Sequence, residues 1–146
     1  MKRLFLRALL AVSIAYVLEA EIDMQESSHR AIERRETGWH LLREGEPFFV
    51  TGAFGEYRMD LLAEYGGNAV RASARRESLD EAGRHGLAVM VNLPARGERS
   101  GLDWDDLEQV AAQKERILEI VAELMDHPAV MFWSVGNELD YIPGRD

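Results

Sequence analysis

The residues of this chain best placed to do chemistry are Asn137 and Glu138, which follow an apolar run at residues 129–133. Gly136 allows the backbone to turn directly before them. The run is typical of a buried parallel strand, and binding and catalytic groups of α/β sheets collect at the C-terminal ends of such strands. A carboxyl group there is a candidate for proton transfer or ligand binding. The alternative is a solvated loop Glu, the commoner state of a single Glu after a strand.

Two further polar residues belong to apolar runs. Arg71 lies inside a short run at 68–72, where burial is costly unless the guanidinium is paired. Alternatively, Arg71 lies near the strand end and reaches solvent. Asn92 is near the C-terminal end of the run at 87–93, which again indicates a site. A satisfied core amide explains Asn92 equally well, so both alternatives stay open.

These residues need a scaffold of alternating strands and helices. A hairpin is expected at 39–50, with its turn at Glu44-Gly45. Asp103 is the expected N-cap of the longest helix, and the apolar runs at 87–93 and 129–133 predict strands buried on both faces. The strands are predicted near 48–53, 68–72, 87–93 and 129–134, and the helices near 57–65, 77–85 and 103–126. Alternation alone fits either a barrel or a doubly wound sheet.

The longest predicted helix also has an apolar stripe at helical spacing, which predicts its buried face. The residues of this stripe are Leu107, Val110, Ala111, Ile117, Val121, Leu124 and Met125.

Several strings along the chain resemble motifs of one enzyme family. They are GGNAVR at 66–71, LDEAGRHGLAVMVNLP at 79–94, and HPAV running into WSVGNE at 127–138. The chain resembles retaining glycoside hydrolases with a (β/α)8 barrel, particularly family 2 and its relatives in the same clan. The resemblance covers about residues 39–138. It implies an α/β fold, a partial TIM barrel of about four βα units preceded by a β-hairpin.

The resemblance also implies roles for individual residues. Glu138 would be the general acid/base and Asn137 would contact the sugar's 2-hydroxyl. Arg71 would order the catalytic carboxylates as a bidentate donor, and Asn92 is expected to bind substrate at the same edge. The family's nucleophile is a Glu at the end of strand seven, whereas this sequence ends at Asp146, just beyond strand four. A complete barrel needs about 250 residues.

The expectation is therefore a retaining glycoside hydrolase, with this chain as the N-terminal half of the barrel within a longer protein. Its partners would be a carbohydrate substrate and the missing C-terminal half barrel in cis, or a second copy of the chain. An alternative is a non-catalytic carbohydrate-binding or self-assembling half-barrel module. An unrelated parallel α/β enzyme is a third option.

Composition excludes several other classes. The net charge of −9 and the lack of a Lys/Arg cluster disfavour nucleic acid as a partner. With no Cys, disulfides, thiolate catalysis and Cys-based zinc sites are excluded. No metal or cofactor is expected, because neither ligand-spaced His or carboxylate clusters nor a phosphate loop occurs. His127, at the start of the last predicted strand, is expected to have a structural role.

The N-terminus predicts export. Residues 1–20 combine a basic start at Lys2, Arg3 and Arg7 with an apolar core at 8–18, the pattern of a signal peptide. A buried N-terminal helix is the alternative. The protein is expected to be secreted or periplasmic, with no stable membrane span after cleavage. The expected domains are a signal peptide at 1–20, an irregular N-terminal segment at 21–38, and the half barrel at 39–146.

Overall fold

The computed structural model describes residues 30–137 and 139, which fall into two compact units divided between Phe49 and Val50. The predicted signal peptide and Glu138 lie outside these residues. The first unit is an antiparallel sheet in the order β1-β2-β3. Its strands are β1 (Arg30–Arg35), β2 (Gly38–Arg43) and β3 (Glu46–Pro47).

The predicted hairpin with its turn at Glu44-Gly45 is confirmed. Both residues have positive φ, 54° and 81°, as a two-residue turn between antiparallel strands requires. The segment preceding this hairpin contains the regular strand β1, which pairs with β2 from Arg30↔Arg43 to Arg35↔Gly38. Most of β1 is exposed, so its pairing with β2 holds it in place. Such pairing produces no alternation of apolar and polar residues that could be recognised in the sequence.

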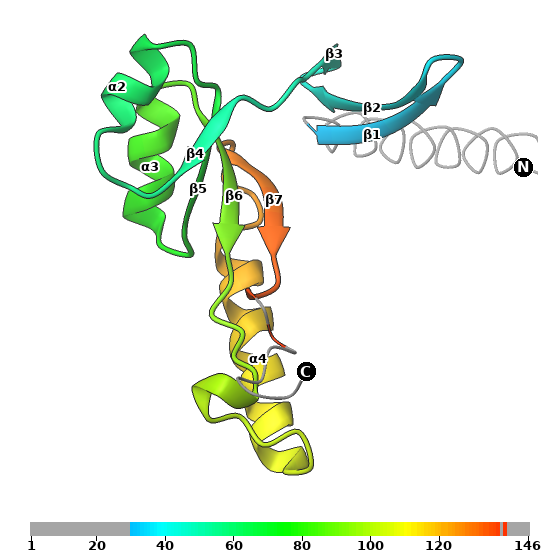
Figure 1. Ribbon diagram of the computed structural model, residues 1–146, viewed down its shortest axis with the longest axis vertical. Helices are drawn as coiled ribbons and strands as arrows, with labels where there is room; N and C mark the ends of the chain where they lie inside the picture. The colour runs from blue at the N-terminus through cyan, green and yellow to red at the C-terminus, as the bar shows by residue number, and fades with distance from the viewer. Residues whose placement is uncertain (1–29, 138, 140–146) are drawn as a thin grey trace, which may run out of the picture. The chain divides into compact units, whose positions relative to one another are not determined.

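The second unit is a parallel sheet in the order β4-β5-β6-β7, the same order as along the chain (Figure 1). A doubly wound sheet reverses its strand order, whereas the wall of a barrel keeps it. The observed order therefore favours a barrel wall. The elements are β4 (Gly52–Phe54), α2 (Met59–Glu64), β5 (Ala69–Ser73), α3 (Arg76–Arg84), β6 (Ala88–Asn92), the 3-10 helix η2 (Glu98–Ser100), α4 (Leu107–Leu124) and β7 (Val130–Ser134).

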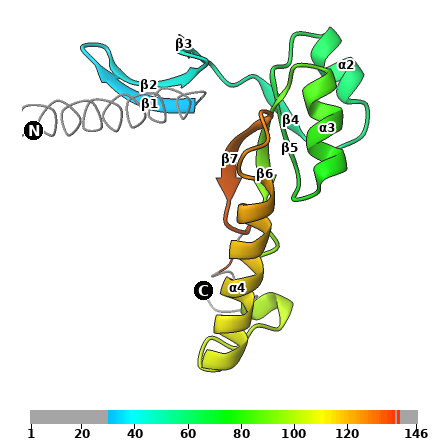
Figure 2. The same ribbon diagram turned by 180° about the vertical axis from the view of Figure 1, so that it is seen from behind.

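One face of this sheet is covered by all three α-helices, and the core lies between them (Figure 2). Side chains alternate between the two faces of a strand, so every second strand residue faces the helices. The core consists mainly of Val70, Ala72, Val89, Val91 and Val130 from the strands, and Met59, Leu79, Ala82, Ile120 and Leu124 from the helices.

Among the described residues the opposite face is only partly covered. Ala88 is buried on this face, but the prediction that the run at 87–93 is buried on both faces is wrong at Met90. Met90 is 38% exposed and Phe54 is 78% exposed on this side. Together with Phe132 they line a hollow of about 540 Å³. An apolar run shows that a strand can be covered on both faces, but the residues that the structure describes cover the second face only in part.

Helix α4 begins later than predicted. Its N-cap is Asp106, whose side chain accepts hydrogen bonds from the backbone N–H groups of Glu108 and Gln109. Asp103 instead accepts from the N–H of Asp105 in the preceding turn. Both aspartates follow the local chemistry of caps and turns, so sequence alone did not separate them.

The predicted apolar stripe on α4 is only partly buried. Leu124 is buried and Ile117 and Val121 pack against the core, but Leu107 is 77% exposed and Met125 is also exposed. The N-terminal half of α4 extends past the C-terminal ends of β6 and β7, which leaves Leu107 without a sheet to cover it (Figure 1).

Candidate active site

Arg71, Asn92 and Asn137 meet at the C-terminal edge of the parallel sheet. The Arg71 guanidinium donates from Nη2 to Asn92 Oδ1 at 2.6 Å and from Nη1 to Asn137 Oδ1 at 3.4 Å. The three residues come from β5, from β6 and from the turn after β7. The structure therefore brings together three of the four residues that the sequence singled out.

The surroundings of Arg71 leave part of its donor capacity unused. Its Nε is buried and has no hydrogen-bond partner among the residues that the structure describes. The guanidinium carbon lies 5.5 Å from the centre of the Phe54 ring, within cation–π range. Within the described ranges, Arg71 pairs with two amides and with no carboxylate.

Strand register explains why these side chains converge. Arg71 lies opposite Met90, and two residues later Ser73 lies opposite Asn92, on the same face of neighbouring strands. Beyond β7 the backbone turns at Gly136, whose φ of 84° is rare for residues other than glycine. This turn leads to Asn137. Glu138 follows Asn137 but lies outside the described residues, so its catalytic role stays a prediction.

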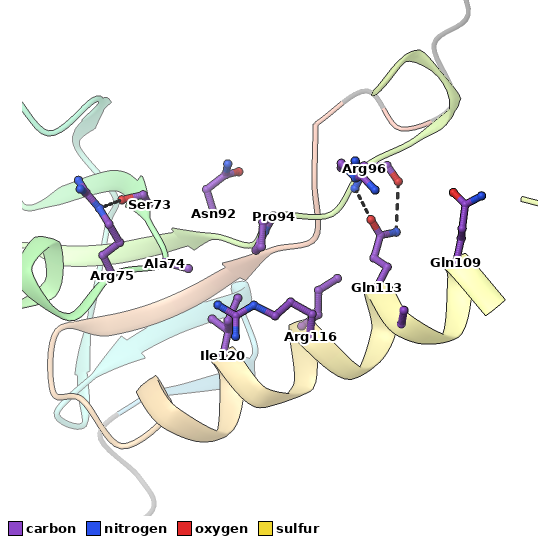
Figure 3. Close-up of a pocket in the computed structure, with 12 residues that line it drawn as sticks. Ser73, Ala74, Arg75, Asn92, Pro94, Arg96, Gln109, Gln113, Arg116 and Ile120 are labelled. Carbon is purple, nitrogen blue, oxygen red and sulfur yellow. Dashed lines mark hydrogen bonds between the residues drawn. The ribbon is translucent and has the colours of Figure 1, made fainter. Parts of the chain in front are cut away.

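A groove of about 820 Å³ lies along the outer side of the same edge, between the strand ends and α4 (Figure 3). Pro94 and Arg96 line it, so the loop after β6 contributes to the surface beside Asn92. The start of this loop therefore lies on the face where the candidate site is. Arg75 and Arg116 add positive charge to the rim, although each also pairs with a glutamate.

Glu56 binds the loops of this edge together, and the sequence pattern gave no signal for it. Its carboxylate accepts from the Ser73 N–H at 2.6 Å and from Ser78 Oγ at 2.9 Å, and it pairs with Arg75. Desolvation by burial raises the pKa of Glu56, but the hydrogen bonds from Ser73, Ser78 and Arg75 outweigh it and lower the pKa to about 2.

We expect Glu56→Gln to destabilise the protein at neutral pH by about 1–2 kcal/mol, a figure reduced for solvent screening. Because the pKa falls from 4.5 to about 2 on folding, the carboxylate's contribution is complete above pH 4.5 and is lost as the pH falls toward 2. Urea denaturation between about pH 3 and pH 7 measures this. The stability difference from wild type should shrink at low pH.

The matched control is Glu64→Gln, which makes the same charge change on α2. The side chain of Glu64 forms no hydrogen bond or ion pair with the rest of the described chain. A Glu56→Gln protein with the same stability and the same pH dependence as this control would contradict the role of Glu56.

His127 has the structural role that the sequence predicted. Its Nδ1 accepts from the N–H of Ala129 at 3.1 Å, so the proton lies on Nε2, which is 3.1 Å from Asp80 Oδ1. It precedes β7, at the end of the strand opposite Asn137. Within residues 30–137 and 139, the structure contains no group of three or more His, Cys, Asp or Glu residues that could hold a metal ion.

A parallel wall in chain order, with polar side chains at its C-terminal edge, is the architecture of a (β/α)8-barrel enzyme. Residues 56–144 match the family described as "Glycosyl hydrolases family 2, TIM barrel domain". The match covers more than half of the chain, and the chain belongs to this family. The resemblance seen in the sequence motifs is thereby confirmed.

Individual relatives agree with this assignment. A β-glucuronidase of Bacteroides fragilis is 26% identical over 85 residues, which are 54% of this chain and 12% of that protein. The structure of a β-glucuronidase from an uncultured Clostridium species matches 75% of this chain and 23% of its own, with a TM-score of 0.56 and 25% identity.

A family 2 glycosyl hydrolase structure from Bacteroides cellulosilyticus has the same fold. It matches 75% of this chain and 16% of its own, with a TM-score of 0.54 and 23% identity. The chain therefore spans less than a quarter of the length of each of these three relatives.

Proposed function

We propose that the protein containing this chain hydrolyses O-glycosidic bonds with retention of configuration, and that the chain forms the N-terminal half of its barrel. The observation that carries the proposal is the cluster of Arg71, Asn92 and Asn137 at the C-terminal edge of a family 2 barrel wall. This is the edge where barrel enzymes place their catalytic groups.

In the proposed mechanism, Glu138 acts first as an acid and then as a base. It donates its proton to the glycosidic oxygen while a second carboxylate, from the other half of the barrel, attacks the anomeric carbon. The bond from that carbon to the oxygen breaks and the sugar remains covalently attached. Glu138 then takes a proton from water as the water attacks the same carbon and releases the carboxylate.

The described residues at the edge of the sheet would bind the sugar and stabilise the charged groups of this mechanism. The amide of Asn137 would hold the sugar's 2-hydroxyl, a contact that strengthens in the transition state. The positive charge of Arg71 would favour the ionised form of nearby carboxylates, and its unpaired Nε is a further donor. Asn92 orients the guanidinium through its 2.6 Å bond, so it supports the site through Arg71.

A β-glucuronide is the first substrate class to test. One relative in sequence and one in structure are β-glucuronidases. A substrate carboxylate would also be compatible with the arginines beside Asn92, at Arg75, Arg96 and Arg116. We therefore propose an acidic sugar in preference to a neutral one.

We also propose that residues 1–20 direct export, which makes the protein secreted or periplasmic. In the part of the chain that the structure describes, no helix has the length and apolarity needed to cross a bilayer. The proposed partner of the wall is the C-terminal half barrel in cis, because β4 and β7 each have a neighbour on one side only among the described strands.

A second candidate is a non-catalytic sugar-binding module that assembles from two copies. The uncovered apolar face with Phe54, Met90 and Phe132 favours it, because a second copy could cover that face. Two such half barrels would place the partner's Glu138 at strand position eight instead of seven. Sedimentation of the isolated 146-residue chain tests this candidate. A dimer that binds sugar without cleaving it would favour it.

Hydrolysis of nitrophenyl glycosides tests the main proposal. The assay uses the longer gene product that contains this chain, with paired α- and β-linked substrates. Proton NMR of the first sugar released shows its anomeric configuration. We expect cleavage of a β-linked substrate with a β-anomer formed first. An α-anomer formed first, or no cleavage of any substrate, would contradict the proposal.

A further inference from the structure

We infer that Gly97 and Gln113 are positioning residues for the turn after β7, of which the structure describes residues 136, 137 and 139. This inference rests on the proposed function, because that function gives the turn its substrate-binding and catalytic roles. Neither residue belongs to a motif in the sequence. Both act through the loop between β6 and α4, which lies against the end of the turn.

Gln113 fixes the loop to α4. Its side-chain oxygen accepts from the N–H of Arg96 at 2.8 Å, and its side-chain nitrogen donates to the carbonyl of Arg96 at 3.2 Å (Figure 3). A single amide therefore satisfies both backbone groups of one loop residue. Such a reciprocal pair orders the loop at a defined point along the helix.

Gly97, the next residue, is buried at the centre of the loop. Its carbonyl accepts from the N–H groups of Ser100 at 2.9 Å and of Leu102 at 3.2 Å, and Leu102 is itself buried. These bonds hold the backbone of Gly97 from one side. Small movements of this residue would therefore disturb η2 and the packing of Leu102.

The backbone of Leu139 lies against the other side of Gly97. A β-carbon at position 97 would lie 2.1 Å from the Leu139 carbonyl oxygen and 2.8 Å from its carbonyl carbon. Both distances are too short for any real contact, and both atoms belong to the backbone. Only glycine lets the two strand-end loops approach this closely.

Contacts within the turn link the position of Leu139 to that of Asn137. The side chain of Leu139 lies over Gly136, where an added β-carbon would be 2.5 Å from Leu139 Cδ2. Asn137, between these two residues, is bonded to Arg71. Displacing Leu139 from Gly97 would therefore shift the groups that the proposed mechanism needs in place, and a misplacement of about 1 Å can reduce a rate by about 10²-fold.

Hydrogen exchange on the 146-residue chain tests the geometry without any substrate. The variants are Gly97→Ala and Gln113→Ala. The control is Gln109→Ala, which removes a side-chain amide of the same kind from the same helix. Within the described ranges this amide bonds to Asp106 and not to the loop. We expect the amides of Asn137 and Leu139 to exchange about tenfold faster in both variants, with β5 and β6 unchanged.

Exchange equal to that of the control, or faster exchange spread evenly over β5 and β6, would overturn the inference. Should Gly97→Ala fail to fold, Gln113→Ala decides, since it removes atoms and adds none.

A kinetic measurement on the longer, active protein separates positioning from general stability. We expect kcat of Gln113→Ala to fall about tenfold while KM stays within about twofold of wild type. Faster exchange in the turn with an unchanged kcat would overturn the positioning role. A wild-type protein without hydrolytic activity would refute the proposed function, whereas the exchange result would still test the contact between the two loops.

Discussion

Replacing Glu138 with Gln in the longer protein should reduce kcat/KM for glycosides with poor leaving groups by about 10³-fold, because general acid catalysis contributes about 10²–10⁴-fold. Gln cannot donate a proton to the departing oxygen. Substrates whose leaving group departs without a proton, such as dinitrophenyl glycosides, should still form the covalent intermediate. Steady-state kinetics across a series of aryl glycosides, ordered by leaving-group pKa, measures this difference.

The matched control for this series is Glu98→Gln, an exposed Glu in the loop between β6 and α4. It makes the same change of charge and should leave the whole series unaffected. Added azide should rescue turnover of activated substrates by Glu138→Gln, since azide attacks the intermediate without a general base. Full turnover of poor substrates by the Gln variant would contradict the acid/base role.

Arg71→Met should lower kcat/KM by about 10²-fold or more. The substitution removes the positive group that donates hydrogen bonds to both Asn92 and Asn137. Asn137 would lose its anchor, and nearby carboxylates would lose a favourable charge. Kinetics on the longer protein measures the loss, and thermal unfolding of the same sample measures stability.

Stability should change by only about 1–2 kcal/mol in Arg71→Met, because losing the bond to Asn92 is partly offset by removing the buried, unpaired Nε. Arg71→Lys separates the effect of charge from that of geometry. Lys keeps the positive charge but cannot donate to Asn92 and Asn137 from two fixed nitrogens. We expect Lys to recover part of the activity. A Met variant with wild-type kcat/KM would show that Arg71 only packs against Phe54.

The part of the site that could be predicted consists of residues that break an apolar pattern. Arg71 and Asn92 stand out within apolar runs, and the cost of burying them indicated that they need partners. The structure shows that they are partners of each other. The sequence could not show this, because their pairing depends on the register of β5 and β6.

Contacts between loops were not predictable, for a related reason. Glu56 meets Ser73 and Gln113 meets Arg96 across 17 residues of sequence in each case. A Glu or Gln in a polar segment is indistinguishable from its solvated neighbours until the backbone is placed. Gly97 is similar, since its small size matters only because Leu139 lies beside it.

Strand burial shows a different limit. The order of β4 to β7 agrees with the predicted strands, because glycine turns and apolar runs are local signals. Whether the second face of a strand is covered depends on what lies opposite it. Met90 and Phe54 are apolar and yet exposed here, as expected if the proposed second half of the barrel covers this face.

A crystal structure of the longer protein, carrying Glu138→Gln and bound to an intact aryl glycoside, tests the central claim most directly. We predict the side chain at position 138 at the same sheet edge as Arg71, within about 3 Å of the glycosidic oxygen, with Asn137 on the 2-hydroxyl. A side chain at position 138 that points to the opposite end of the strands, or a sugar bound away from Arg71, would contradict it.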